Sequence, residues 1–304
     1  MKYEVSLSIG AFQSFLGDIA ALDAAKEIGL TCVDFDLLRY DCAREGNLYT
    51  KSEDEIASHF EAVRRHGEEI GVRIGQTHGR IQGWKKDEAF NENETKGARL
   101  DAMATRLLGS RYCVVHSVHL GPQVSGEEHC ALNTPMFDTY LSFAKENGIK
   151  IATETFGDSH LPDGRADVDF FGRKSEFIHA YEKISAKDGN APYFCTCMDT
   201  GHTNKAYRFE GQPSVPEMIL ALGNSIECLH LNDNDRMTDQ HKMPLSGCID
   251  WKATMEALRE VGYAGSYNME LSLGYYGKTF EMIKSYAEFS VKVMKQLLIN
   301  CYGE

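Results

Sequence analysis

The chain has 304 residues, of which 42% are hydrophobic and 25% charged, and this balance excludes a disordered or fibrous protein. Its 32 basic and 45 acidic residues give a net charge of −13, which disfavours binding to nucleic acid and to anionic membranes. Nine scattered cysteines, no signal peptide and no apolar run of about 18 residues predict a cytoplasmic protein with reduced thiols.

Short β-rich runs alternate with helix-forming runs along the whole chain. Several predicted helices end at a glycine, such as Gly71 and Gly148, and the next strand follows within a few residues. The predicted strands cover residues 4–10, 31–37, 72–78, 112–116, 149–154, 193–199, 225–231 and 265–271. The predicted helices include residues 18–28, 52–70, 94–108, 134–147, 251–261 and 278–299.

This order of elements predicts the fold. Parallel strands need crossover connections, and eight strands alternating with helices favour a closed barrel, which commonly needs about 250 residues. We therefore predict an α/β protein that forms a single (β/α)8 TIM barrel over residues 1–304. An open doubly wound sheet is the alternative, but the turn Ser8-Ile-Gly-Ala-Phe-Gln13 lacks its G-x-G-x-x-G pattern. The missing pattern also argues against nicotinamide chemistry.

Four consecutive predicted strands end on, or close to, residues that bind metals. They are Glu154, Asp199, His230 and Glu270. Chemistry in such a barrel lies at the carboxyl ends of the strands, so these side chains should converge. Three carboxylates and one imidazole suit Mn²⁺, Mg²⁺ or Co²⁺. We expect all four to bind one divalent ion, most simply Mn²⁺, with Zn²⁺ also compatible. Strand ends are often polar, so the prediction depends on the four residues together.

Cys195 and Cys197 alternate with Asp199, which places all three on one face of a strand. A Cys-x-Cys pair also occurs in zinc sites, but no second pair accompanies it. Small thiols packed beneath the metal are the preferred interpretation.

The segments around the predicted ligands resemble the xylose isomerase-like superfamily of sugar isomerases and epimerases. They read Asp199-Thr-Gly-His202, His230-Leu-Asn-Asp-Asn-Asp-Arg236, Gly247-Cys-Ile-Asp-Trp251 and Asn268-Met-Glu270. The resemblance, which includes ketose 3-epimerases and inosose dehydratases, implies the same four metal ligands. It also implies that His202 and Arg236 contact the substrate. The epimerases carry a second glutamate where this chain has His160, and this departure points to a different substrate or reaction.

The resemblance implies proton abstraction from a ketose or related sugar through a metal-stabilised enediolate. Glu154 and Glu270 are the expected catalytic residues, one removing the proton and the other returning it. The same enediolate could expel a leaving group. A lyase or dehydratase, similar to inosose dehydratases or C-glycoside deglycosidases, is therefore the alternative.

A trinuclear zinc phosphoesterase similar to endonuclease IV is the second alternative, because it shares the barrel. Its extra ligands would match His78, His116, Asp239 and His241. The acidic net charge argues against a polyanionic substrate. In a sugar enzyme we expect these four residues to contact the substrate, together with Trp84 as an aromatic wall.

The remaining predictions concern the ligand and the surroundings of the site. Residues 157–169, rich in Gly, Asp and Pro, are a candidate mobile cover. We expect a small carbohydrate as ligand, and neither nucleic acid nor membrane. A phosphorylated sugar would need cations, for which Lys205, Arg208, Arg236 and Lys242 are candidates. A homo-oligomer and a partner subunit both stay open.

Overall fold

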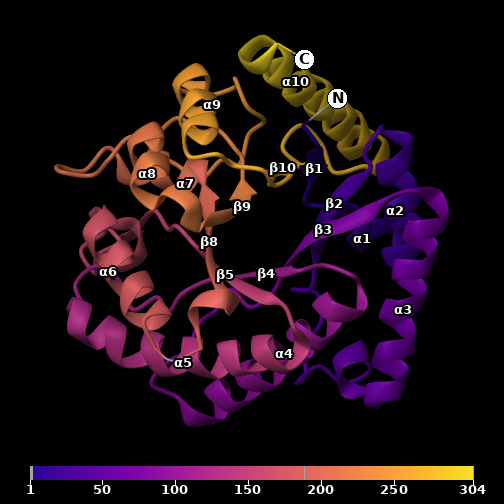
Figure 1. Ribbon diagram of the computed structural model, residues 1–304, viewed down its shortest axis with the longest axis horizontal. Helices are drawn as coiled ribbons and strands as arrows, with labels where there is room; N and C mark the ends of the chain where they lie inside the picture. The colour runs from indigo at the N-terminus through magenta and orange to yellow at the C-terminus, as the bar shows by residue number, and fades with distance from the viewer. Residues whose placement is uncertain (1–2, 188, 304) are drawn as a thin grey trace.

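The computed structural model describes residues 3–187 and 189–303, in which a ring of parallel strands lies inside a ring of helices (Figure 1). The strands of the ring are β1 (Val5–Leu7), β2 (Cys32–Asp36), β3 (Arg73–His78), β4 (Tyr112–Val115), β5 (Lys150–Glu154), β8 (Phe194–Asp199), β9 (Ile226–His230) and β10 (Tyr267–Met269). Each lies within one of the predicted ranges, so the predicted strand order is confirmed.

Backbone pairing closes these strands into a barrel. β2, β3, β4, β5, β8 and β9 form one parallel sheet in that order, while β1 pairs in parallel with β10. Isolated bridges from Ser8 to Asp34 and from Leu231 to Met269 join the two parts. Every strand therefore has a neighbour on both sides, and all carboxyl ends open at one rim.

The helices that surround the barrel begin and end at recognisable signals. At the start of α3, Ser52 and Glu55 form a reciprocal capping box, and the helix stops at Gly71, whose φ is 71°. The helices are α1 (Gly10–Leu16), α2 (Asp18–Glu27), α3 (Glu53–Ile70), α4 (Glu88–Leu107), α5 (Gly126–Asn147), α6 (Lys174–Ser185), α7 (Thr200–Ala206), α8 (Val215–Leu222), α9 (Trp251–Glu260) and α10 (Phe280–Tyr302). Short 3₁₀ turns are η1 (Leu48–Thr50), η2 (Phe170–Gly172), η3 (Ala191–Tyr193) and η4 (Gly223–Ser225). Across residues 3–187 and 189–303, no helix combines the length and apolarity that a membrane span requires.

Apolar side chains fill two regions. The larger core lies between the strands and the helices, and a smaller cluster of short side chains is made of residues from the central strands. The smaller cluster contains Val114, Ala152, Cys195, Cys197 and Cys228. The predicted packing of the two β8 cysteines is thus confirmed, and these small residues lie on the strands that carry the rim residues.

Two segments differ in kind from the predicted elements, and two helices begin earlier than predicted, α4 at Glu88 rather than at residue 94 and α5 at Gly126 rather than at residue 134. The first strand ends at Leu7 rather than at residue 10, and α1 begins at Gly10 because tertiary contacts favour a helix there. The ring of Phe12 is fully buried against Phe280, and the Gln13 amide bonds to the backbone of Asp36. Residues 157–169 contain a hairpin, in which β6 (Asp158–His160) pairs antiparallel with β7 (Ala166–Val168).

Candidate metal centre and active site

The four predicted metal ligands meet at the rim of the barrel. Glu154, Asp199 and His230 are the last residues of β5, β8 and β9, and Glu270 directly follows β10. Each offers one donor atom, and these four atoms lie within 4.8 Å of one another. The first three side chains are buried, whereas 21% of the Glu270 side chain is exposed. This group could hold one metal ion. A small molecule would reach that ion from the side of Glu270, the partly exposed residue.

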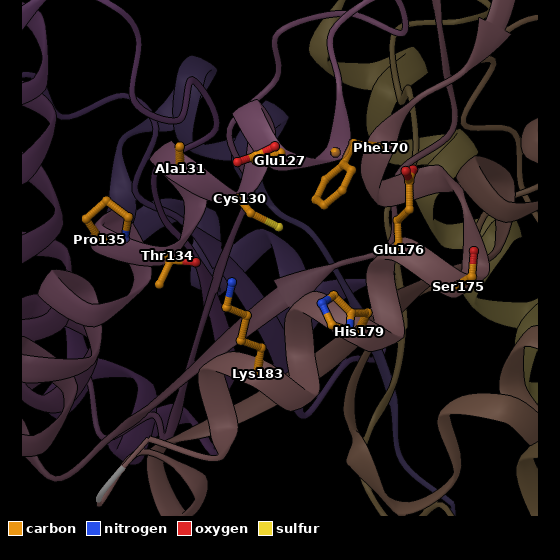
Figure 2. A pocket seen from close by; sticks show the side chains of 11 residues that line it. Glu127, Cys130, Ala131, Thr134, Pro135, Phe170, Ser175, Glu176, His179 and Lys183 are labelled. Carbon is orange, nitrogen blue, oxygen red and sulfur yellow. The ribbon is translucent and has the colours of Figure 1, made fainter.

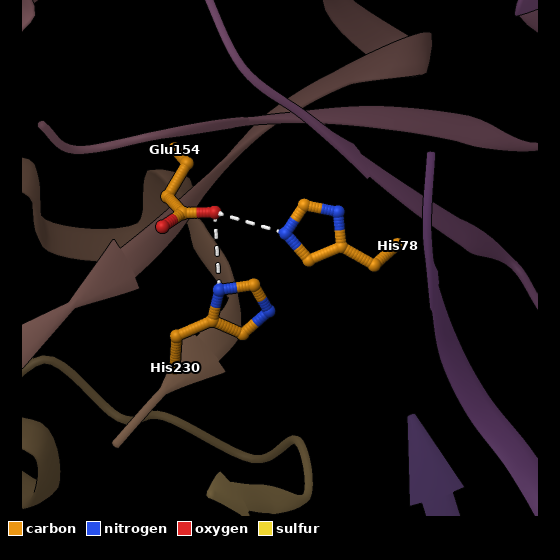
Figure 3. A group of neighbouring side chains, drawn as sticks. All are labelled: His78, Glu154 and His230. Carbon is orange, nitrogen blue, oxygen red and sulfur yellow. Dashed lines mark ion pairs between the residues drawn. The ribbon is translucent and has the colours of Figure 1, made fainter. Parts of the chain in front are cut away.

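Glu154 lies among imidazoles. Its Oε2 atom lies 3.0 Å from His230 Nδ1 and 3.6 Å from His78 Nε2, and dashed lines in Figure 3 mark these two contacts. In addition, His116 Nε2 is 3.3 Å from Oε2, and His202 Nδ1 is 3.1 Å from Oε1. Within the described part of the chain, neither oxygen accepts a hydrogen bond of normal geometry. Buried oxygen and nitrogen atoms that converge without hydrogen bonds between them indicate a site that binds a further group, such as a metal ion.

Burial and charge shift the pKa values of this group. Burial alone would raise the pKa of Glu154, but the positive charge of His230, together with the charge and contacts of His116 and the contact with His202, outweighs burial and holds that pKa well below its usual range. Burial raises the pKa of Asp199 to about 6. Burial opposes protonation of His78, yet Glu154 and Glu270 raise its pKa to about 9. The two carboxylates therefore favour a protonated His78, and a cation bound beside it would oppose that protonation.

A second group of potential ligands adjoins the first. Asp239 Oδ2 lies 3.4 Å from His202 Nε2 and 3.3 Å from His241 Nε2, and the donor atoms of all three residues lie within 4.8 Å of one another. His241 Nδ1 is 3.4 Å from Glu270 Oε2, which joins the two groups. The structure thus brings five predicted substrate contacts together with the four predicted ligands. The five are His78, His116, His202, Asp239 and His241.

A comparison of the sequence with models of known protein families identifies the family of this chain. The family model described as xylose isomerase-like TIM barrel matches residues 22–286. The chain belongs to this family. A comparison with curated proteins gives no match.

Solved structures with low sequence identity share this family fold. A D-tagatose 3-epimerase-like protein has a TM-score of 0.68 and 19% identity, over 99% of this chain and 98% of its own. The 3-keto-D-glucoside 4-epimerase of E. coli has a TM-score of 0.69 and 15% identity, over 97% and 99%. An IolI protein with a bound zinc atom has a TM-score of 0.66 and 15% identity, over 98% and 97%.

Two predicted substrate contacts lie outside the group of site residues in this xylose isomerase-like barrel. The Arg236 guanidinium lies 4.8 Å from the centre of the Tyr207 ring, and its Nε is 3.4 Å from Asn204 Oδ1. Trp84 lines a pocket of about 660 Å³ together with residues of α4 and Phe143 of α5. Contact of Arg236 and Trp84 with a substrate stays a prediction.

The acidic residues of β2, Asp34 and Asp36, were not predicted from the sequence to belong to the site. Asp34 Oδ2 lies 3.3 Å from His230 Nε2 and accepts hydrogen bonds from Ser8 Oγ at 2.7 Å and Asn268 Nδ2 at 3.0 Å. A carboxylate behind a histidine fixes the orientation of the ring. The available signal was the run Cys32-Val-Asp-Phe-Asp36, which places two acids in an otherwise apolar strand.

The loop that follows β9 is fixed by two buried polar side chains, Asn232 and Asp233. Buried Asp233 accepts hydrogen bonds from the Gly247 backbone at 2.9 Å and from Trp251 Nε1 at 2.8 Å. Its neighbour Asn232 donates from Nδ2 to Asp199 Oδ2 at 2.9 Å. This loop therefore joins the start of α9 to the barrel and orients a predicted metal ligand.

The predicted cover, residues 157–169, lies beside the site. Phe156, just before it, packs its ring 5.2 Å from the His202 ring. At its other end, Asp169 Oδ2 lies 2.6 Å from His119 Nδ1, in the loop between β4 and α5. The hairpin is thus held at its base by a histidine–carboxylate contact.

Raising the pH should loosen this cover. The hydrogen bond to Asp169 raises the pKa of His119 above its usual value. Such a contact stabilises fully below about pH 6.5 and is lost as the pH rises through the folded-state pKa. We expect hydrogen–deuterium exchange in residues 157–169, corrected for intrinsic rates, to quicken between about pH 6 and about pH 9. His119→Gln should exchange quickly at both, and equal protection of the wild type at both would contradict the expectation.

A larger pocket, of about 770 Å³, lies outside the barrel between α5 and α6 (Figure 2). Side chains such as Cys130, Phe170, His179 and Lys183 line it. Its lining in the described structure includes none of the predicted site residues. Size alone therefore does not identify the active site of this protein.

Proposed function

We propose that this protein is a divalent-metal-dependent isomerase or epimerase that acts on a ketose or a related sugar. The convergence of Glu154, Asp199, His230 and Glu270 at one rim carries the proposal. Family membership and the sugar epimerases among the structural neighbours support a small carbohydrate as substrate. Nine free cysteines support a location in the cytoplasm.

The residues at the rim fit a metal ion. Both oxygens of Glu154 and the Nδ1 atom of His230 are buried, and none of these three atoms has a hydrogen-bond partner in residues 3–187 and 189–303. Carboxylate oxygens with one imidazole suit Mn²⁺, Mg²⁺, Co²⁺ or Zn²⁺, of which we propose Mn²⁺. When bound, the ion would stabilise the negative charge that develops on the substrate oxygens.

Glu154 and Glu270 are proposed to move the proton. His230 Nδ1 lies 3.0 Å from Glu154 and 3.4 Å from Glu270, and His78 Nε2 lies 3.6 Å from each. The two carboxylates therefore border one small volume from different strands. One would remove the proton next to the carbonyl of the sugar, and the other would return it to the opposite face.

The surrounding side chains would bind and orient the sugar. The proposed substrate contacts are His78, His116, His202, Arg236, Asp239, His241 and Trp84. His241 lies beside Glu270, and Asp239 lies beside His241, which supports the proposal that these two side chains hold hydroxyls next to the reacting carbon.

Metal content and proton exchange test the proposal together. Protein purified without chelator should contain one divalent ion per chain. In D₂O it should exchange a carbon-bound proton of at least one ketose in a panel followed by NMR. Removal of the ion should stop the exchange, and Mn²⁺ should restore it. A metal-loaded protein that exchanges no ketose would contradict the proposal.

A lyase or dehydratase would use the same residues up to the proton abstraction. The product separates the two functions. Elimination gives a dehydrated sugar or a released aglycone, whereas epimerisation gives only an isomer of the same mass.

A trinuclear zinc phosphoesterase is the second candidate. The group formed by His202, Asp239 and His241, beside the rim ligands, favours it. The net charge of −13 disfavours a polyanionic substrate. Three zinc ions per chain with hydrolysis of a phosphodiester would establish this function, whereas one ion with ketose exchange would eliminate it.

Asp34→Asn should weaken metal binding about 10- to 100-fold. The substitution keeps the shape of the side chain but removes the charge 3.3 Å from His230 Nε2 that orients this ligand. Calorimetric titration with Mn²⁺ measures the effect. Ser8→Ala, which removes only a hydrogen bond to Asp34, is the control and should change the affinity less. Equal affinities of wild type and Asp34→Asn would contradict this role.

A further inference from the structure

A small pocket opens beside the metal-ligand group, at the ends of β1, β2, β3 and β10. Its volume is about 220 Å³, and Glu270 and His78, both at the rim, form part of its wall. A water molecule occupies about 30 Å³ of the liquid, so the pocket has room for about seven. A sugar bound at the rim could therefore extend its far end into this pocket.

The wall of the pocket is rich in hydrogen-bond acceptors. Asp34, Asp36 and Glu270 contribute three carboxylates, against the single imidazole of His78. Asp34 is fully buried, and its Oδ1 has no hydrogen-bond partner among the described residues. Asp36 uses Oδ1 to accept a hydrogen bond from the Leu38 backbone at 2.6 Å. Asp34 Oδ1 is therefore a buried acceptor that a ligand in this pocket could satisfy.

The cations that a phosphate would require are engaged elsewhere. Lys205 Nζ lies 3.0 Å from Asp158, and Arg208 pairs with the same carboxylate. The guanidinium of Arg236 lies over the ring of Tyr207, and Lys242 Nζ lies 5.4 Å from the centre of the Tyr275 ring. A phosphate at the pocket would meet like charge instead of these side chains.

We propose that this pocket binds the uncharged, hydroxyl-rich end of the sugar, so that the substrate is a free ketose rather than a sugar phosphate. The inference rests on the proposed function and adds Asp36 as a residue that determines specificity. Sugar hydroxyls donate to buried carboxylates in charge-assisted hydrogen bonds, whereas a phosphate dianion is repelled.

Asp36→Asn tests the inference with two substrates of different length. With D-fructose, KM for proton exchange should rise at least about tenfold while kcat changes little, because the lost contact lies away from the reacting carbon. Dihydroxyacetone has three carbons and lacks the far end of a six-carbon sugar, so the inference predicts that its exchange does not change. An equal rise of KM for both substrates would show that Asp36 supports the site as a whole and would overturn the inference.

Gly10→Ala is an independent variant that fills the same space. A Cβ at residue 10 would come within 2.4 Å of Asp36 Oδ2 and must displace that carboxylate. We expect the same selective loss for the six-carbon ketose. Circular dichroism of both variants verifies that the barrel is intact.

Each free ketose of the panel is then compared with its terminal phosphate. We expect kcat/KM at least about tenfold higher for the free sugar, and a preference for the phosphate would overturn the inference. If no ketose exchanges, the proposed function fails, and saturation-transfer NMR with D-fructose decides on the pocket alone. A signal lost in both variants supports the pocket, whereas equal signals from wild type and variants overturn it.

Discussion

Glu270→Gln should lower kcat for ketose proton exchange about 1,000-fold. Glutamine keeps the shape of the side chain but cannot take up a proton, and Glu270 is the one partly exposed carboxylate among the four proposed metal ligands. The substitution also weakens one proposed metal ligand, so the assay is carried out by NMR in D₂O at saturating Mn²⁺. We expect the loss to persist there, because the missing base, not the missing ion, limits the reaction.

Glu227→Gln is the matched control for this substitution. The Glu227 side chain is 26% exposed, close to the 21% of Glu270, but it pairs with Lys150 near the amino end of β9. Its exchange rate should equal that of the wild type. Full recovery of Glu270→Gln by added Mn²⁺ would show that Glu270 only holds the ion and would contradict a role in proton transfer.

Asp233→Ala should lower the free energy of unfolding by about 3 kcal/mol or more. The carboxylate is fully buried and accepts hydrogen bonds from the backbone of Gly247 at 2.9 Å and of Ile249 at 3.2 Å, and from Trp251 Nε1 at 2.8 Å. Alanine would leave these donors without a partner, and each buried unpaired group costs about 1–3 kcal/mol. Urea unfolding of the metal-free protein measures the change as a shift of the midpoint.

Asp235→Ala controls for the loss of a charge in the same loop. Asp235 is exposed and accepts hydrogen bonds from the backbone of Met237 at 2.9 Å and of Thr238 at 2.8 Å, which water can replace. We expect a change below about 1 kcal/mol. Equal losses for the two aspartates would refute the idea that Asp233 anchors the start of α9.

Residues that follow directly from strand position were predictable. Glu154, Asp199, His230 and Glu270 each end or follow a strand whose apolar pattern is clear in the sequence, and a closed barrel brings such ends together. His78 was found in the same way. The strand boundaries alone are therefore enough to predict which residues meet at the rim. An error of one or two residues in a boundary still leaves the predicted ligands near the rim.

Residues that act across the barrel were not predictable. Asp34 faces His230 from the opposite half of the ring, and nothing in the local pattern of β2 reveals a partner almost 200 positions away. Similarly, α1 has little intrinsic amphipathic pattern, and contacts made by Phe12 and Gln13 fix its conformation. Such contacts form only when the ring of strands closes. The composition and periodicity of one short segment do not indicate which distant residue it will contact.

The thiols inside the barrel provide an internal reporter of its opening. Cys195, Cys197 and Cys228 are fully buried, and burial raises the pKa of Cys197 and Cys228 above the usual range. Only a thiolate is alkylated readily, so these side chains are inert while the barrel is closed. The exposed thiol of Cys248 would react first and serve as the reference for an accessible cysteine. Slower labelling of the buried thiols, followed by mass spectrometry, would then measure the rate at which the barrel opens, without any introduced probe.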